Sequence, residues 1–168
     1  MSDNEFDPYR EAAFGAENML GVVRAPEIFR EGQTWFNVTE PLSLQHLEGR
    51  LVILDFWTFC CINCIHVAET LRKLEKAFPE EVVIVGVHSP KFDAEKDPQK
   101  LRQAILRYGI KHPVVHDPDR ELWEQYAIKA WPTLVFLSPQ GTVIGMHSGE
   151  PDLNEMLRAI NDVLDKFK

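Results

Sequence analysis

The only three cysteines of the 168-residue chain, Cys60, Cys61 and Cys64, lie within five residues of one another. Ile62 and Asn63 separate the last two, between a run of strand-forming residues and a helical pattern. At the start of a helix, free backbone N–H groups and the helix dipole stabilise a thiolate. Cys64 lies one helical turn further on, on the same face, where it can attack a disulfide formed on Cys61. The spacing therefore predicts thiol–disulfide exchange, with Cys61 as the nucleophile and Cys64 as the resolving thiol.

An acidic residue, Asp55, lies six positions before Cys61, inside the apolar run LVILDFW. A carboxylate in such a strand is costly to bury, and burial raises its pKa because the charged form is disfavoured. A carboxyl group with a raised pKa suits a general base for Cys64. We therefore predict that Asp55, Cys61 and Cys64 are the catalytic residues.

Zinc binding is the main alternative for this cluster, because His66 adds a fourth potential ligand. Structural zinc sites usually take a second ligand pair from a distant segment, and the chain has no second CxxC. Covalent haem attachment needs a histidine directly after the second cysteine, where Ile65 stands. A purely structural disulfide would close too small a loop to stabilise the fold. We expect no metal and no organic cofactor.

Hydrophobic periodicity indicates the elements that must position these residues. Continuous apolar runs such as 51–57 are typical of strands buried on both faces. A helical pattern follows Cys61 and stops at Pro79, and another begins at Asp97-Pro98 and ends before Gly109. The expected strands are 34–38, 51–57, 82–87, 113–116, 133–137 and 142–147, and the further expected helices are 120–126 and a final one opened by Pro151 and Asp152.

This order of elements predicts an α/β fold made of βαβ, an inserted αβ segment with a further short helix, and ββα. Such alternation favours a mostly parallel central sheet with an antiparallel edge, flanked by helices. The length suits one domain, which we place at 26–168. Residues 1–25 show no clean periodicity and are interpreted as an N-terminal extension.

The composition narrows the classes of partner. The chain carries a net charge of −8 and has no run of Lys or Arg, so we expect neither nucleic acid nor a membrane surface as a partner. Its N-terminus is acidic where a secretory signal would be basic, and no long apolar stretch follows. We therefore expect a cytoplasmic protein. We also expect it to be a monomer.

The chain resembles the thioredoxin superfamily at several separate motifs. Leu-Asp-Phe-Trp at 54–57 resembles the strand that leads into the thioredoxin CxxC, and Asp55 aligns with its buried aspartate. Trp131-Pro132-Thr133 resembles the cis-proline loop, and Gly149 follows at a thioredoxin-like spacing. The resemblance implies a thioredoxin fold in which Pro132 is cis and packs against the cysteine pair. It also implies that the substrate is bound by Ile62, Asn63, Trp131, Pro132, Thr133 and Gly149.

A narrower resemblance covers roughly residues 26–150. The stretches FWTFCCINC, VGVHSPKF, HPVVHDPDRELW and AWPTLVFLSPQG are similar to the thioredoxin-like domain of NHL-repeat-containing proteins. In that family the domain precedes a β-propeller, whose blades take about 40 residues each. We therefore expect either a standalone relative or a domain from a longer protein. The insertion at 97–116 also resembles the larger redoxin branch, which includes TlpA-type proteins and peroxiredoxins.

The chain departs from plain thioredoxin in ways that bear on its redox potential and partners. Cys60 replaces the usual tryptophan, Ile62-Asn63 replaces Gly-Pro, and Glu69 stands where a helix-kinking proline is common. No lysine in the strand 82–87 can partner Asp55.

Other residues near the motif have structural interpretations. We expect Cys60 to be packing filler that faces away from Cys64, His66 to lie at the surface, and His88 to be structural. Trp131 is interpreted as a docking surface beside Pro132. Trp35, Trp57 and Trp123 are expected in or beside the core.

Two other functions remain open at this point. A thiol peroxidase is one, because Thr58 stands three residues before Cys61 as in peroxiredoxin motifs, although Leu54 occupies the place of their proline. A redox-inactive interaction module is the other, and the intact CxxC with Asp55 argues against it. The preferred interpretation has protein disulfides as substrates and a reductase or thiol donor as the second partner.

Overall fold

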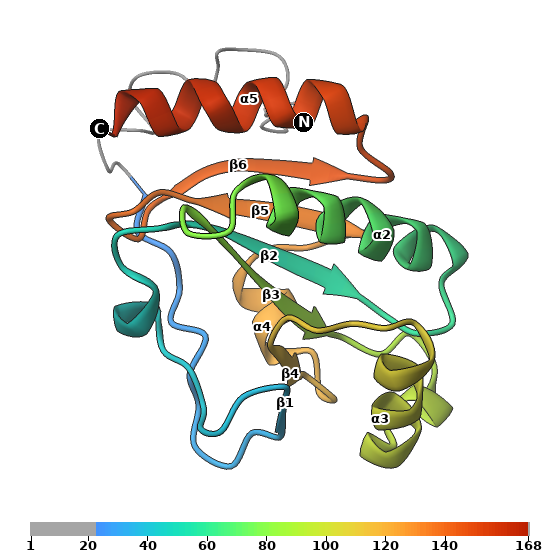
Figure 1. Ribbon diagram of the computed structural model, residues 1–168. Coiled ribbons are helices and arrows are strands. Elements are labelled where there is room, and N and C mark those ends of the chain that lie inside the picture. The colour runs from blue at the N-terminus through green and yellow to red at the C-terminus, as the bar shows by residue number, and fades with distance from the viewer. Residues whose placement is uncertain (1–22, 168) are drawn as a thin grey trace.

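The computed structural model describes residues 23–167, and these form one six-stranded sheet with helices on both faces (Figure 1). The strands are β1 (Trp35–Phe36), β2 (Leu51–Trp57), β3 (Val82–His88), β4 (Val114–His116), β5 (Thr133–Leu137) and β6 (Val143–Ser148). The α-helices are α2 (Ile62–Ala77), α3 (Pro98–Arg107), α4 (Glu121–Gln125) and α5 (Leu153–Lys166), and two 3-10 turns are η1 (Leu44–Leu47) and η2 (Asp93–Lys96).

The strand order is β1-β4-β3-β2-β5-β6, which places β2 at the centre. β2 pairs in parallel with β3, and β3 pairs in parallel with β4. The pairings of β2 with β5, of β5 with β6 and of β1 with β4 are antiparallel. The predicted mixed α/β sheet is confirmed, but the expectation that it is mostly parallel is wrong. Only the βα connections through α2 and α3 make full crossovers, whereas β5 and β6 form a hairpin that runs against β2.

The two faces of the sheet are covered by different helices. The helix α2 lies over one face of the sheet (Figure 1). Apolar side chains of α2 and α5 pack on this face with alternate residues of β2 and β3. The same face continues beneath α3, where Leu101 and Ile105 pack with Trp57 and Val114. The opposite face is covered by α4, by η1 and by the segment that includes Ile28. Every residue of β2 is buried, which explains its continuous apolar run.

The first strand is shorter than expected. We predicted 34–38, but β1 contains only Trp35 and Phe36. Asn37 adopts a left-handed conformation with φ of 63° and so leaves the strand. Its side-chain amide donates to the carbonyls of Ile110 and His112, at 2.9 and 3.0 Å, and fixes this corner to the segment before β4.

The predicted N-terminal extension, 1–25, lies mostly outside the described residues. Of the part that is described, Arg24 forms a β-bridge with Thr142, and Ala25 donates its N–H to the carbonyl of Gly141 at 2.9 Å. These contacts attach residues 23–25 to the start of β6. Within 23–167, no helix is both long and apolar enough to cross a membrane.

Candidate active site

The pair Cys61 and Cys64 lies where β2 ends and α2 begins. Cys61 is the N-cap of α2, and its Sγ accepts a hydrogen bond from the backbone N–H of Cys64 at 3.3 Å. This is the predicted helix-terminus position, in which a thiolate receives an N–H donor and the positive end of the helix dipole. The Cys61 side chain is half-buried and reachable, whereas Cys64 is 1% exposed. The two thiols are therefore unequal, and Cys61 is the more accessible of the pair.

The Cys64 thiol is held in its protonated form. Burial, the hydrogen bond to Cys61 and the nearby charge of Asp55 raise the pKa of Cys64 well above its ordinary value. A thiol in this environment reacts only if a base takes its proton.

Asp55 is the predicted base for Cys64, and its charge acts on that thiol. It lies in β2, is 3% exposed, and burial raises its pKa to about 7. Its Oδ1 has no hydrogen-bond partner among residues 23–167. The predicted raised pKa of this carboxyl group is thus confirmed, with desolvation as its cause.

The second wall of the site is the loop before β5. The Trp131–Pro132 peptide bond is cis, as the resemblance implied, and Pro132 is buried. Gly149, with φ of +91°, donates its N–H to the Pro132 carbonyl at 2.9 Å and so fixes the backbone of this loop. Thr133 pairs with Phe56 across the sheet, which places the loop at the same end of β2 as the cysteines. Thr133 Oγ1 also donates to the Ala130 carbonyl at 2.7 Å.

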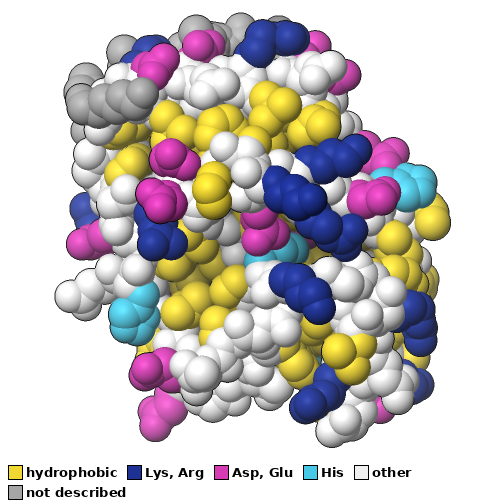
Figure 2. Space-filling model, viewed as in Figure 1, with side chains coloured by type: hydrophobic (Ala, Val, Ile, Leu, Met, Phe, Trp, Pro, Cys, Tyr) yellow, Lys and Arg dark blue, Asp and Glu magenta, His cyan; other side chains and the backbone are white. Residues whose placement is uncertain are grey.

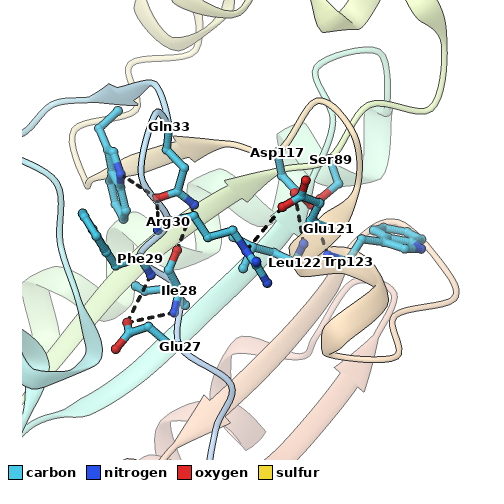
Figure 3. Close-up of polar contacts among 11 residues, drawn as sticks. Glu27, Ile28, Phe29, Arg30, Gln33, Ser89, Asp117, Glu121, Leu122 and Trp123 are labelled. Carbon is cyan, nitrogen blue, oxygen red and sulfur yellow. Dashed lines mark hydrogen bonds and ion pairs between the residues drawn. The ribbon is translucent and has the colours of Figure 1, made fainter.

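Trp131 is fixed in place on one side of this loop. Its indole N–H donates to the Ser89 carbonyl at 2.7 Å, and its ring lies 4.1 Å from that of Trp123. Trp123 is fixed in turn, because the carboxylate of Asp117 accepts the backbone N–H groups of Trp123 and Leu122 at the start of α4 (Figure 3). Asp117 also accepts the Ser89 hydroxyl at 2.8 Å (Figure 3).

The segment just before Cys61 is held by a buried acid that the sequence did not reveal. Glu95 is fully buried, and its carboxylate accepts from the Thr58 hydroxyl and from the N–H of Cys60 at 3.1 Å. It also accepts the N–H groups of Lys91 and Phe92, at 3.1 and 2.9 Å. The Thr58 hydroxyl is therefore engaged with Glu95, which weakens the analogy with the peroxiredoxin motif.

Two buried histidines also help to fix the segment before Cys61. Phe59 donates its N–H to Nε2 of His88 at 3.3 Å, and Nδ1 of His88 lies 3.3 Å from Nδ1 of His116. Nε2 of His116 lies 2.9 Å from the Lys96 carbonyl, which only accepts. These partners assign one tautomer to each neutral ring, so that His88 donates to His116 and His116 donates to Lys96. His88 is structural, as expected, and it supports the backbone next to Cys60.

The outcomes for the remaining candidate residues are mixed. Ile62 and Asn63 are exposed beside Cys61, where a substrate could contact them. His66 lies at the surface, as expected, 2.7 Å from Glu150. The expectation that Cys60 is packing filler is wrong: it is exposed and bonded through its N–H to Glu95, because the chain turns outward after Trp57.

In the described part of the chain, no group of three or more His, Cys, Asp or Glu side chains is arranged so that it could hold a metal ion. His112 and His116 have the spacing of an HxxxH pair, but they precede and end a strand rather than share a helix face. Their Nδ1 atoms lie 3.3 Å from Glu75 and His88 respectively.

Comparison with known proteins decides the family. The thioredoxin-like family model matches residues 49–143, which include β2, Cys61, Cys64 and the cis-proline loop. The chain belongs to the thioredoxin-like family. It is 48% identical over 130 residues to the chloroplastic protein SUPPRESSOR OF QUENCHING 1 of Arabidopsis thaliana, and 47% identical over 143 residues to NHL repeat-containing protein 2 of Bos taurus. These alignments cover 74% and 83% of this chain but only 12% and 20% of those proteins, so the chain spans a fifth or less of their length.

Other relatives are named for redox chemistry. The thiol-disulfide oxidoreductase ResA of Halalkalibacterium halodurans is 26% identical over 66% of this thioredoxin-like chain and 60% of its own. A thiol-disulfide isomerase from Corynebacterium glutamicum superposes with a TM-score of 0.71 at 25% identity, covering 83% of this chain and 96% of its own. The predicted resemblance to the thioredoxin-like domain of NHL-repeat proteins is confirmed, and these relatives support a general thiol–disulfide redox function.

Proposed function

We propose that this domain is a thiol–disulfide oxidoreductase that exchanges a Cys61–Cys64 dithiol or disulfide with disulfides of other proteins. One observation carries the proposal: the reachable Sγ of Cys61 accepts the N–H of Cys64 at the start of α2, and the Cys64 thiol is buried behind it. The Asp55 carboxyl group is close enough for its charge to raise the pKa of Cys64. These features support the proposed roles of Cys61 as nucleophile, Cys64 as resolving thiol and Asp55 as base.

The reduction of a substrate would proceed in two exchanges. The Cys61 thiolate attacks one sulfur of the substrate disulfide, and the other substrate sulfur leaves as a thiolate that takes a proton from solvent. Asp55 then takes the proton of Cys64, and the Cys64 thiolate attacks Sγ of Cys61. This second exchange releases the other substrate thiol and leaves a Cys61–Cys64 disulfide. Two electrons and two protons reach the substrate for each disulfide reduced.

The proposed reaction needs no bound metal or organic cofactor, because the electrons reside in the two thiols. A dithiol reductase or another thiol donor would restore the reduced pair by the same exchanges in reverse. Ile62 and Asn63, which are exposed beside Cys61, and the half-buried Trp131 are the proposed contacts for the substrate chain. Thr133 is 1% exposed, so its proposed part is to hold the loop before β5. We further propose that the domain acts as a monomer.

Trapping of the mixed disulfide tests the proposal. Cys64→Ser should leave the first exchange intact and retain partner proteins on Cys61, and Cys61→Ser should abolish both trapping and insulin reduction. Cys60→Ser is the matched control, because it removes a neighbouring thiol without removing the pair. Equal insulin reduction by Cys61→Ser and wild type, or an adduct that maps to Cys60, would overturn the mechanism. Hydrogen peroxide consumption that leaves a sulfenate on Cys61, without trapped protein, would favour a peroxidase.

A further inference from the structure

Three buried polar atoms around Gly86, on the α2 side of the sheet, have no hydrogen-bond partner among residues 23–167. They are Oδ1 of Asp55, Nε1 of Trp57 and Nε2 of His112. Their residues come from β2 and from the segment before β4, and each is at most 6% exposed. Burying a polar atom without a hydrogen-bond partner costs free energy, so a cluster of three such atoms calls for an explanation.

Gly86 brings these atoms together. It pairs with Asp55 in the parallel register of β2 and β3, so a side chain at 86 would lie beside that of Asp55, about 5 Å away. A Cβ built on Gly86 would lie 3.1 Å from Nε1 of Trp57 and 3.4 Å from Nε2 of His112. The two nitrogens therefore occupy the space next to Asp55 that a side chain at position 86 would take.

The other side of the His112 ring faces outward. Its Nδ1 lies 3.3 Å from Oε1 of Glu75, a side chain of α2 that is 36% exposed. A carboxylate only accepts, so Nδ1 is the donor to Glu75, and in the ring's neutral form Nε2 carries a lone pair that faces the interior. His112 and Glu75 both line a hollow of about 420 Å³ between α2 and residues 109–112. Figure 2 shows Lys and Arg side chains gathered on this face, and the hollow's lining includes Arg72, Lys76 and Lys111.

We propose that His112, with Glu75, is the proton path between Asp55 and solvent. The proposal rests on the function proposed above, in which Asp55 takes the proton of Cys64. In this proposal one water would accept from Nε1 of Trp57 and donate to Asp55 and to Nε2 of His112, which would satisfy all three unpaired atoms and complete the path. His112 acts through Asp55 and is therefore a positioning residue for the exchange.

The protons that His112 takes up and releases balance over one redox cycle. When Cys64 resolves the mixed disulfide, its proton passes from Asp55 to Nε2 of His112, and Nδ1 releases a proton through Glu75. The ring is left as the Nε2–H tautomer. When a thiol donor reduces the Cys61–Cys64 disulfide, Nε2 returns a proton through Asp55 to Cys64, and Nδ1 regains one through Glu75. The two half-reactions alternate the tautomer, so the ring needs no rotation.

The titratable and charged groups that face this path lie on β2, α2 and β3 and beside His112, whereas Leu101 and Ile105, the α3 residues packed against Trp57, are apolar. These titratable and charged groups are Asp55 on β2, His88 at the end of β3, Lys111 beside His112, and Cys64, Arg72, Glu75 and Lys76 on α2. The ring of His88 lies 4.9 Å from that of Trp57.

The test separates the two exchanges in single-turnover reduction of a disulfide peptide by the reduced protein. His112→Ala should slow release of the second peptide thiol at least roughly tenfold, with formation of the mixed disulfide unchanged. Added imidazole should restore release, because it carries both nitrogens, and 1-methylimidazole should not, because it cannot pass a proton through. Glu75→Gln, which keeps His112 in place, should slow the same step.

Other results would overturn the path. One is a wild-type release rate in both variants. The other is that imidazole and 1-methylimidazole both fail to rescue His112→Ala, or that both rescue it equally. The wild-type protein in the same assay reports on the function itself. If wild type forms no mixed disulfide, the proposed function fails. If wild type turns over and the variants match it, only the proton path fails.

Discussion

The carboxylate of Glu95 accepts the backbone N–H of Cys60 at 3.1 Å, so an acid 35 residues further along the chain fixes the residue before the nucleophile. Glu95 also binds the hydroxyl of Thr58 and is fully buried. Its charge has a second effect. Burial, then the charge of Glu95 and its hydrogen bond, raise the pKa of the Cys60 thiol, while Lys100 lowers it. Cys60 is exposed but is kept less reactive than its exposure suggests.

Removal of the Glu95 charge should therefore activate Cys60. In a background with Cys61 and Cys64 replaced by Ser, Glu95→Gln should raise the alkylation rate of Cys60 at pH 7.5 roughly threefold to tenfold, because a lower pKa increases the fraction of Cys60 that is thiolate. The rate is measured by mass spectrometry. Asp93→Asn is the control, because the Asp93 side chain is 98% exposed and lies two residues away. Equal rates in the two variants would remove Glu95 as the cause.

The order in which the thiols react is a second prediction. Cys61 is reachable at the start of α2, and Cys64 is buried with a raised pKa. Iodoacetamide at pH 7 should therefore label Cys61 before Cys60 and Cys64, and peptide mapping of partly labelled protein measures the order. Labelling in denaturant should abolish the differences, since they arise from the fold. If Cys60 is labelled first, the nucleophile has been assigned to the wrong residue.

Burial of Asp55 predicts a pH dependence of stability. Its pKa is about 7 in the folded protein against 3.8 for the free group, so the folded state holds the proton more tightly. The resulting stability is complete below about pH 4 and is lost as the pH rises through 7. Asp55→Asn should therefore exceed wild type in free energy of unfolding at pH 8, by up to about 4 kcal/mol, and match it near pH 4.

Urea denaturation at both pH values measures this difference. The exposed Asp119→Asn is the matched control and should shift neither curve. The same Asp55→Asn protein should release substrate slowly from its mixed disulfide, because Cys64 has lost its base. An Asp55→Asn protein that is no more stable than wild type at pH 8 would mean that another group satisfies the buried carboxylate.

Local patterns were enough to predict the elements that carry the chemistry. The run 51–57 and the helical spacing after Cys61 place the thiols at a strand-to-helix junction, and Asp55 in an apolar strand implies its raised pKa. These features depend on residues close together in the chain. The mixed strand directions were harder to predict, because the reversal of β5 depends on how the chain returns after α4.

The supporting residues were missed for a different reason. Glu95 stands in the charged stretch DAEKD, and nothing local distinguishes it from its exposed neighbours. Its partners Thr58 and Cys60 are more than 30 residues away. Gly86 carried a usable signal, since a glycine inside a strand often marks a close approach of other groups. That signal does not say which groups approach, and here they are Trp57 and His112.

His88 predicts the opposite pH trend from Asp55. Burial and the neighbouring His116 lower its pKa to about 3 from 6.5, so the folded protein excludes the charged ring. The stability that depends on neutral His88 is present above about pH 6.5 and is lost as the pH falls, by up to about 1.4 kcal/mol per unit. His88→Gln, whose amide can still accept from Phe59 and donate to His116, should flatten this loss between pH 6.5 and 4. The exposed His46→Gln should keep the wild-type slope in the same urea titrations, and equal slopes in all three proteins would show that protonation of His88 does not limit acid stability.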